Sequence, residues 1–170
     1  MMTIRSVVLF LMFGMLSSVA QAAFWHKPPG RPDTGYGSVE RHITDTYTEY
    51  RFGAASDGDQ TWYYVPNQLK YGDHAPVVVF LHGFAALYPS FYQSHIEHLL
   101  AQGNIVIFPQ FQKATLTGFL SEAGLGQAAD QNLWARRAVE TTEEALDLLG
   151  DVADRDEIYL YGHSLGGLIT

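Results

Sequence analysis

Cysteine is absent from the 170 residues of the chain, which excludes a disulfide framework and a thiol for lipid attachment. Basic residues are scarce, because 10 Lys and Arg stand against 18 Asp and Glu and give a formal net charge of −8. That balance argues against nucleic acid or an anionic membrane surface as a partner. Runs of like charge are missing as well, so the composition predicts a folded chain with one core.

One long apolar run does occur, near the amino terminus. Arg5 precedes an almost wholly apolar stretch from Val7 to Leu16, and Ala20-Gln21-Ala22 has the small-residue pattern of a signal-peptide cleavage site. The run is short for a spanning helix, and a retained anchor is the alternative interpretation. The sequence therefore predicts a signal peptide over residues 1–22, cleavage after Ala22, and a secreted or periplasmic protein without a stable membrane span.

Two parts follow the predicted signal peptide. Residues 23–35 are rich in proline and glycine and predict an irregular leader, whereas residues 36–170 predict part of one α/β domain. The stretches 38–52 and 61–65 are rich in β-branched and aromatic residues. We expect them to be the two strands of an antiparallel hairpin at the edge of a larger sheet.

Strands and helices alternate from Val77 onward, which is typical of a mostly parallel sheet with flanking helices. A helix after Pro89 is expected to end at Gly103 and to be followed by a strand over 104–108. Residues 110–129 show no regular hydrophobic periodicity and predict a long loop with one helical turn.

Asp130 is the expected N-cap of the next helix, which should end at Gly150. Its spacing predicts a buried face made of these residues: Trp134, Ala138, Ala145, Leu148 and Leu149.

The pentapeptide Gly162-His163-Ser164-Leu165-Gly166 follows a short apolar strand over 157–161. Such a pattern is typical of a nucleophile elbow, in which a sharp strand-to-helix turn presents the serine hydroxyl near a helix N-terminus. Gly162 and Gly166 flank the turn because a β-carbon at either position would collide with the neighbouring strand or helix. The alternative is an ordinary glycine turn with an exposed serine.

A second signal lies upstream. Pro76 precedes five consecutive apolar residues, Val77 to Leu81, which suit a strand buried on both faces of a parallel sheet. His82-Gly83-Phe84 follows, and a turn of this kind at the end of such a strand commonly builds half of an oxyanion hole. The backbone N–H of Phe84 would be one donor and that of Leu165 the other. A buried strand with a glycine turn and no chemistry is the alternative.

Together these two motifs, at this separation, make the stretch from Val77 to Thr170 resemble the N-terminal half of an α/β-hydrolase of the lipase/esterase kind. The resemblance implies that Ser164 is the nucleophile and that Phe84 and Leu165 supply the oxyanion amides. It implies hydrolysis of a small-molecule carboxylic ester without a metal or organic cofactor. The family's acid and histidine follow the serine, so we expect them beyond Thr170, in a chain truncated after its elbow and inactive by itself.

Other functions share these features. Peptidases, thioesterases and haloperoxidases use the same elbow, and a secreted non-catalytic binding module of the same fold is the alternative from another class. His95 and His98 lie three residues apart on one predicted helix, where a solvated helix face is more common than a metal site. Apolar residues of the 110–129 loop suit either an acyl pocket or a self-packed surface loop, as follows: Phe111, Leu116, Phe119 and Leu120. Tyr88 and Phe91 suit either the pocket wall or the core.

Overall fold

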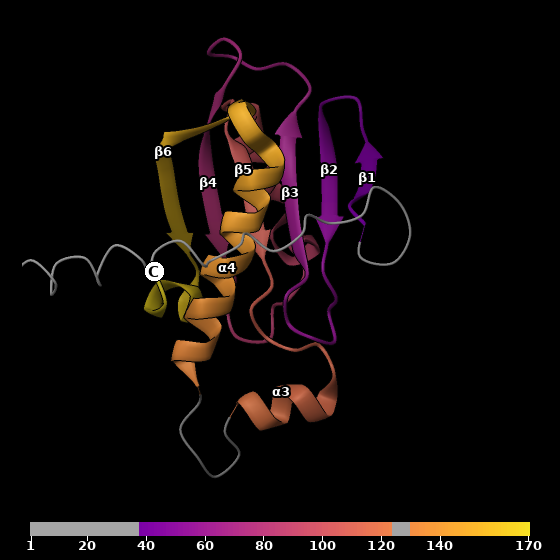
Figure 1. The fold of residues 1–170 in the computed structure, drawn as a ribbon, viewed down its shortest axis with the longest axis vertical. Helices are drawn as coiled ribbons and strands as arrows, with labels where there is room; N and C mark the ends of the chain where they lie inside the picture. The colour runs from indigo at the N-terminus through magenta and orange to yellow at the C-terminus, as the bar shows by residue number, and fades with distance from the viewer. Residues whose placement is uncertain (1–37, 124–129) are drawn as a thin grey trace, which may run out of the picture. The chain divides into compact units, whose positions relative to one another are not determined.

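The computed structural model describes residues 38–123 and 130–170, in which six strands form one mixed sheet (Figure 1). The strands are β1 (Glu40–Ile43), β2 (Tyr47–Phe52), β3 (Thr61–Pro66), β4 (Ala75–Leu81), β5 (Ile105–Pro109) and β6 (Ala153–Gly162). Their spatial order is β1-β2-β3-β5-β4-β6. β4 runs parallel to both of its neighbours, and the remaining pairs are antiparallel. This arrangement confirms the predicted α/β class with an antiparallel edge.

The amino-terminal edge differs from the prediction in one respect. Residues 38–52 form two strands rather than one, because the chain turns back between Ile43 and Tyr47. The Thr44 hydroxyl accepts a hydrogen bond from the N–H of Tyr47 at 3.0 Å and donates to its carbonyl at 2.7 Å. A threonine side chain can bond its local backbone in this way and stabilise a turn, although its β-propensity favours a continuous strand.

Two helices cover opposite faces of the sheet. All seven residues of β4 are buried, as expected for a strand between parallel neighbours. On one face Val77 and Val79 pack with the long helix α4 (Gln131–Leu149), and on the other Phe80 packs with α2 (Gln93–Ala101). The alternation of side chains along β4 thus supplies both core clusters.

The helix boundaries follow the signals in the sequence. The Asp130 carboxylate accepts from the N–H of Leu133 at 3.0 Å and caps α4, which ends at Leu149 with Gly150 as its C-cap. Gly103, with φ 99°, follows α2 and confirms the predicted stop. The predicted buried face of α4 is correct except for Leu148, which is 41% exposed. Four other residues of that prediction are buried.

Three 3₁₀ helices and one short α-helix complete the described chain. The 3₁₀ helices are η1 (Pro89–Tyr92), η2 (Gly150–Val152) and η3 (Ser164–Leu168). The stretch expected as a loop contains the α-helix α3 (Leu116–Glu122), capped by the Thr115 hydroxyl, which accepts from the N–H of Gly118.

Some predictions fall outside the described residues. The signal peptide over 1–22, the leader over 23–35 and the loop residues 124–129 are among them. None of the helices within 38–123 and 130–170 is long and apolar enough to cross a membrane.

Candidate active site

The strand β6 ends at Gly162, and the 3₁₀ helix η3 begins two residues later, at Ser164. Ser164 is exposed and has φ 53°, a left-handed conformation that non-glycine residues rarely adopt. A backbone in this region is destabilised by about 1–3 kcal/mol and persists where the surrounding structure imposes it. The strained strand-to-helix turn expected of a nucleophile elbow is therefore present at the predicted serine.

Two glycines allow the turn to be this tight. A β-carbon on Gly162 would lie 2.6 Å from the backbone of Gly166 and Gly167, well inside van der Waals contact. A β-carbon on Gly166 would overlap the carbonyl oxygen of Leu81, the last residue of β4. The elbow thus folds directly against the end of the neighbouring strand, where only hydrogen fits.

The carboxyl end of β4 carries the other half of the predicted site. Gly83 to Ala86 form a turn in which the N–H of Ala86 donates to the Gly83 carbonyl at 3.1 Å. Ala85, the third residue, has φ 61°, the positive value that a type II turn requires there. The pairing of Leu81 with Gly162 brings this turn and the elbow to the same edge of the sheet.

Both backbone donors proposed for the oxyanion hole are available. Among the described residues, neither the N–H of Phe84 nor that of Leu165 has an acceptor. The preceding N–H, that of Gly83, differs because it donates to the Tyr92 hydroxyl. Leu165 itself is buried at 9% exposure, and Phe84 is half exposed.

His82 orients the turn rather than facing solvent. Its ring is fully buried and stacks on Phe111 with centroids 3.9 Å apart and planes 2° apart. Its Nδ1 lies 2.8 Å from the Gly83 carbonyl, to which it donates as a neutral ring protonated on Nδ1. Burial lowers the pKa of His82 to about 4, so the ring is neutral near pH 7. The Gly83 carbonyl and the Phe84 N–H belong to one planar peptide, so this bond also sets the direction of that N–H.

Tyr92 joins the two halves of the site. Its hydroxyl accepts from the N–H of Gly83 at 2.8 Å and lies 3.0 Å from Nδ1 of His163 in the elbow. The N–H of His163 donates to the carbonyl of Leu81 at 2.9 Å. The local sequence pattern does not distinguish Tyr92, because hydrophobic periodicity detects its ring and carries no information on its hydroxyl.

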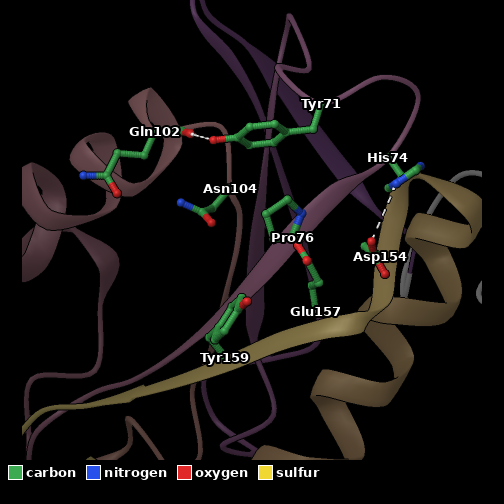
Figure 2. A pocket seen from close by; sticks show the side chains of 8 residues that line it. All are labelled: Tyr71, His74, Pro76, Gln102, Asn104, Asp154, Glu157 and Tyr159. Atoms are coloured by element: carbon green, nitrogen blue, oxygen red, sulfur yellow. Dashed lines mark hydrogen bonds and ion pairs between the residues drawn. The ribbon is translucent and has the colours of Figure 1, made fainter.

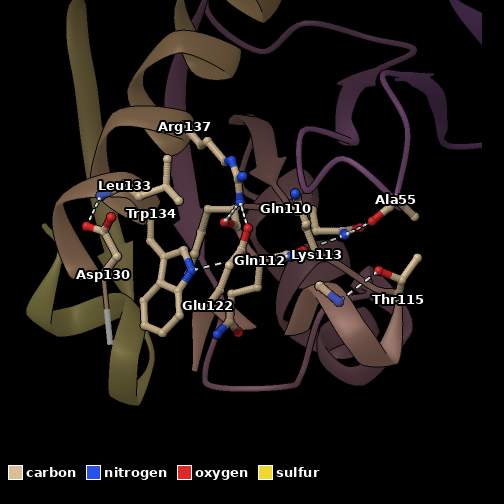
Figure 3. Close-up of polar contacts among 12 residues, drawn as sticks. Ala55, Gln110, Gln112, Lys113, Thr115, Glu122, Asp130, Leu133, Trp134 and Arg137 are labelled. Carbon is tan, nitrogen blue, oxygen red and sulfur yellow. Dashed lines mark hydrogen bonds and ion pairs between the residues drawn. The ribbon is translucent and has the colours of Figure 1, made fainter. Parts of the chain in front are cut away.

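Gln112 is a second polar residue that bonds the turn after β4. Its Oε1 accepts from the N–H of Ala85 at 3.1 Å. Its own carbonyl accepts from the Gln110 amide at 2.7 Å (Figure 3). Nothing in the local sequence pattern distinguishes Gln112, since its partner is 27 residues away.

A buried ion pair supports the segment that carries Gln112. Arg137 of α4 donates to Glu122 at 2.6 Å and to the Phe111 carbonyl at 3.3 Å (Figure 3). The same carboxylate accepts from the N–H of Lys113 and from the indole N–H of Trp134. Residues 111 and 113, on either side of Gln112, are therefore both attached to this network.

The aromatic residues near the turn divide between surface and core. Tyr88 and Phe91 are exposed at 41% and 66%, and Leu116 at 72%, so all three contribute apolar surface at this edge. Phe111 is buried beneath His82 and belongs to the core. Phe119 contacts Phe84 at a centroid distance of 5.0 Å, which places α3 beside the Gly83–Ala86 turn, the proposed oxyanion turn.

The described residues give Ser164 no hydrogen-bond partner, so no base is in place beside its hydroxyl. For His95 and His98, no group of three potential metal ligands occurs within 38–123 and 130–170. His98 instead accepts from the Gln102 amide at 2.7 Å.

The opposite end of the sheet has a polar hollow of about 470 Å³ (Figure 2). It lies where β4 and β6 begin, and its lining includes Tyr71, His74 and Asp154. The elbow follows the other end of β6, and ligands of open α/β sheets bind at the carboxyl ends of the strands. The site is therefore placed at the elbow and not in this hollow.

Comparison with known proteins agrees with the fold and the motifs. A family model described as chlorophyllase matches residues 65–170, whereas no curated protein matches by sequence. An S-formylglutathione hydrolase from Agrobacterium tumefaciens is similar in structure, with a TM-score of 0.53 and 20% identity over 76% of this chain and 53% of the other. A glucuronoyl esterase from Solibacter usitatus is similar with a TM-score of 0.52 and 17% identity, over 84% of this chain and 49% of the esterase.

An acetyl xylan esterase from Paenibacillus sp. R4 is similar with a TM-score of 0.51 and 19% identity, over 78% of this chain and 47% of the esterase. The chain thus spans about half the length of these three enzymes. At such identities the likeness concerns the fold, which is that of the α/β-hydrolases, and the family comes from the sequence model. The chlorophyllase family model matches residues 65–170, a range that contains both Phe84 and Ser164. The chain therefore belongs to the chlorophyllase family of α/β-hydrolase-like proteins.

Proposed function

We propose that the protein is an exported serine hydrolase that cleaves carboxylic esters through an acyl-enzyme on Ser164. The observation that carries the proposal is the strained, exposed Ser164 at the same sheet edge as two backbone N–H groups that have no acceptor among residues 38–123 and 130–170. The Ser164 oxygen attacks the ester carbonyl carbon, and the N–H groups of Phe84 and Leu165 stabilise the oxyanion. The alcohol leaves with a proton, and water then hydrolyses the acyl-enzyme.

The reaction requires a base that the described residues do not place beside Ser164. We propose that a histidine and a carboxylate from outside the described residues complete the triad, in the order serine, acid, histidine. In that mechanism the histidine accepts the serine proton and returns it to the leaving alcohol. We do not assign His163 as this base, because its Nδ1 is bonded to Tyr92 and, among the described residues, no hydrogen bond joins its ring to Ser164.

Substitution of the nucleophile in the full-length protein tests the proposal. Ser164→Ala is expected to lower kcat for a short-chain p-nitrophenyl ester by at least about 10³-fold. Ser94→Ala, which removes an exposed serine hydroxyl from α2, is the matched control and should retain wild-type turnover. A fluorophosphonate should label Ser164 in the wild-type protein, as read by peptide mass spectrometry. Undiminished turnover by Ser164→Ala would exclude the assignment.

The ester class and the export have separate tests. The family name and the esterases of similar fold support a carboxylic ester as substrate, so chlorophyll and acetylated sugars belong in the substrate panel. For export, the mature protein isolated from its natural host should begin at Ala23. An amino terminus at Met1 or Met2 in that material would contradict signal-peptide cleavage.

A further inference from the structure

The Tyr92 hydroxyl is the one side-chain group that bonds both halves of the proposed oxyanion hole within the described residues. One bond reaches the N–H of Gly83, which directly precedes Phe84, and the other reaches His163, two residues before Leu165. The two proposed donors lie on segments that are about 80 residues apart in the chain, as the numbering of Gly83 and His163 shows. Their relative position therefore depends on a contact between the segments.

The ring of Tyr92 is held firmly enough to serve as such a contact. It packs against Phe80 at a centroid distance of 4.9 Å and against Phe108 at 5.8 Å, on the α2 face of the sheet. A buried aromatic cluster of this kind restricts the ring, and so fixes where the hydroxyl oxygen lies.

The fit around the hydroxyl is close. A β-carbon on Gly83 would lie 2.7 Å from Nδ1 of His163 and 3.2 Å from the Tyr92 oxygen, so the turn, the elbow and the tyrosine meet at one point. Because the Tyr92 oxygen accepts from Gly83, its hydrogen is free to donate, and Nδ1 of His163 is its acceptor. We assign His163 as the tautomer protonated on Nε2, which satisfies both bonds.

We propose that Tyr92 is a positioning residue that fixes the spacing between the Phe84 and Leu165 N–H donors. The inference rests on the proposed function, since it requires that these donors stabilise an oxyanion. A carbonyl in the bound ester interacts weakly with both donors, whereas the tetrahedral intermediate needs both at hydrogen-bond distance. Loss of the hydroxyl should therefore lower kcat and leave KM almost unchanged.

Tyr92→Phe in the full-length protein is the direct test, because it removes the hydroxyl and keeps the packed ring. We expect a fall of about 10- to 100-fold in kcat, less than the loss of a whole donor, with KM within about twofold of wild type. Tyr71→Phe is the matched control: it removes an exposed tyrosine hydroxyl that donates to the Gln102 carbonyl at the opposite end of the sheet. It should leave both constants unchanged. Wild-type kcat in a folded Tyr92→Phe protein would overturn the inference.

Variants of His163 test the same link from its exposed side. Asparagine can place its Oδ1 near the position of the ring Nδ1, whereas leucine offers no acceptor. We expect His163→Asn to retain a higher kcat than His163→Leu. We also expect the kcat of the Tyr92→Phe/His163→Leu double variant to be no lower than that of the more impaired single variant. Additive losses in that cycle would overturn the inference.

Fluorophosphonate labelling separates this inference from the proposed function. If wild-type protein is not labelled at Ser164, the nucleophile assignment fails and the role of Tyr92 fails with it. If Ser164 is labelled at the same rate in wild type and Tyr92→Phe, the nucleophile stands and the positioning role alone is wrong. Labelling of Tyr92→Phe at least about tenfold more slowly, with an unchanged thermal unfolding midpoint, is the expected result.

Discussion

The side chain of Gln112 accepts a hydrogen bond from the backbone N–H of Ala85 at 3.1 Å, across 27 positions of sequence. Ala85 has φ 61° and belongs to the turn that carries the Phe84 N–H. A residue in this region is strained and stays there because neighbouring groups hold it. The Gln112 carboxamide is such a group, and it connects the oxyanion turn to the segment after β5.

Gln112→Met should loosen this turn, because methionine has a similar length and provides no comparable acceptor. We expect about 0.5–1.5 kcal/mol lower free energy of unfolding and a several-fold lower kcat on a p-nitrophenyl ester. Urea denaturation and steady-state kinetics of the full-length protein measure the two effects. Gln68→Met, at an exposed loop position, is the control. Turnover equal to that of the control would show that the Ala85 bond does not support the site.

The glycines of the elbow give a prediction with an internal control. A methyl group on Gly166 would overlap the Leu81 carbonyl oxygen, whereas on Gly167 its nearest neighbour would be the Gly162 carbonyl oxygen at 3.5 Å, an ordinary contact. We expect Gly166→Ala to lower the free energy of unfolding by about 2–3 kcal/mol and to abolish fluorophosphonate labelling. Gly167→Ala should stay within about 0.5 kcal/mol of wild type. Equal stabilities of the two variants would contradict the close packing of the elbow on β4.

The features that the sequence predicts correctly are those that depend on residues close together in the chain. The apolar run of β4, the cap at Asp130 and the stop at Gly103 each depend on neighbouring residues, and each is present in the structure. The tight turn at Ser164 belongs to this group too, because its two glycines and its serine lie within five consecutive residues. Local propensity and sterics are enough to place such elements.

The contacts that organise the site were not predictable in this way. Tyr92 and His163 are 71 positions apart, and only the finished sheet brings them together. The break between β1 and β2 differs from the expected single strand for a related reason, since the Thr44 hydroxyl closes a turn where its residue type favours a strand. Hydrophobic periodicity does not predict which polar groups form hydrogen bonds with each other across the fold.

The buried ring of His82 predicts an acid-sensitive fold. Burial lowers its pKa to about 4 in the folded protein, below the ordinary value of 6.5, so the unfolded chain binds the extra proton first. The stabilisation is therefore complete above about pH 6.5 and is lost as the pH falls toward 4, by about 3 kcal/mol in total for this one group. His82→Asn, which has no titrating ring, should lose that part of the pH dependence.

Urea denaturation of wild type and variant at pH 7 and pH 4.5 measures the difference. His42→Asn, at an exposed position on β1, is the control and should show the same change in free energy of unfolding between the two pH values as wild type. Parallel stability curves for wild type and His82→Asn would mean that His82 does not couple folding to protonation.

The ion pair between Glu122 and Arg137 predicts a difference between breaking a buried charge pair and replacing it. Their side chains are 8% and 15% exposed, and the Glu122 carboxylate also accepts from Trp134 and Lys113. Glu122→Leu alone leaves the Arg137 guanidinium without its carboxylate and should lower the free energy of unfolding by about 3–5 kcal/mol. The double variant Glu122→Leu/Arg137→Met removes both charges and should recover a large part of that loss.

Arg136 and Glu140 form the matched surface pair on the same helix, at 3.9 Å with both side chains about two-thirds exposed. Glu140→Leu should change stability by no more than about 0.5 kcal/mol, because solvent screens an exposed pair. Because residues 111 and 113 are bonded to Glu122 and Arg137, Glu122→Leu should also slow Ser164 labelling through Gln112. A Glu122→Leu protein with wild-type stability and labelling would show that the network does not reach the oxyanion turn.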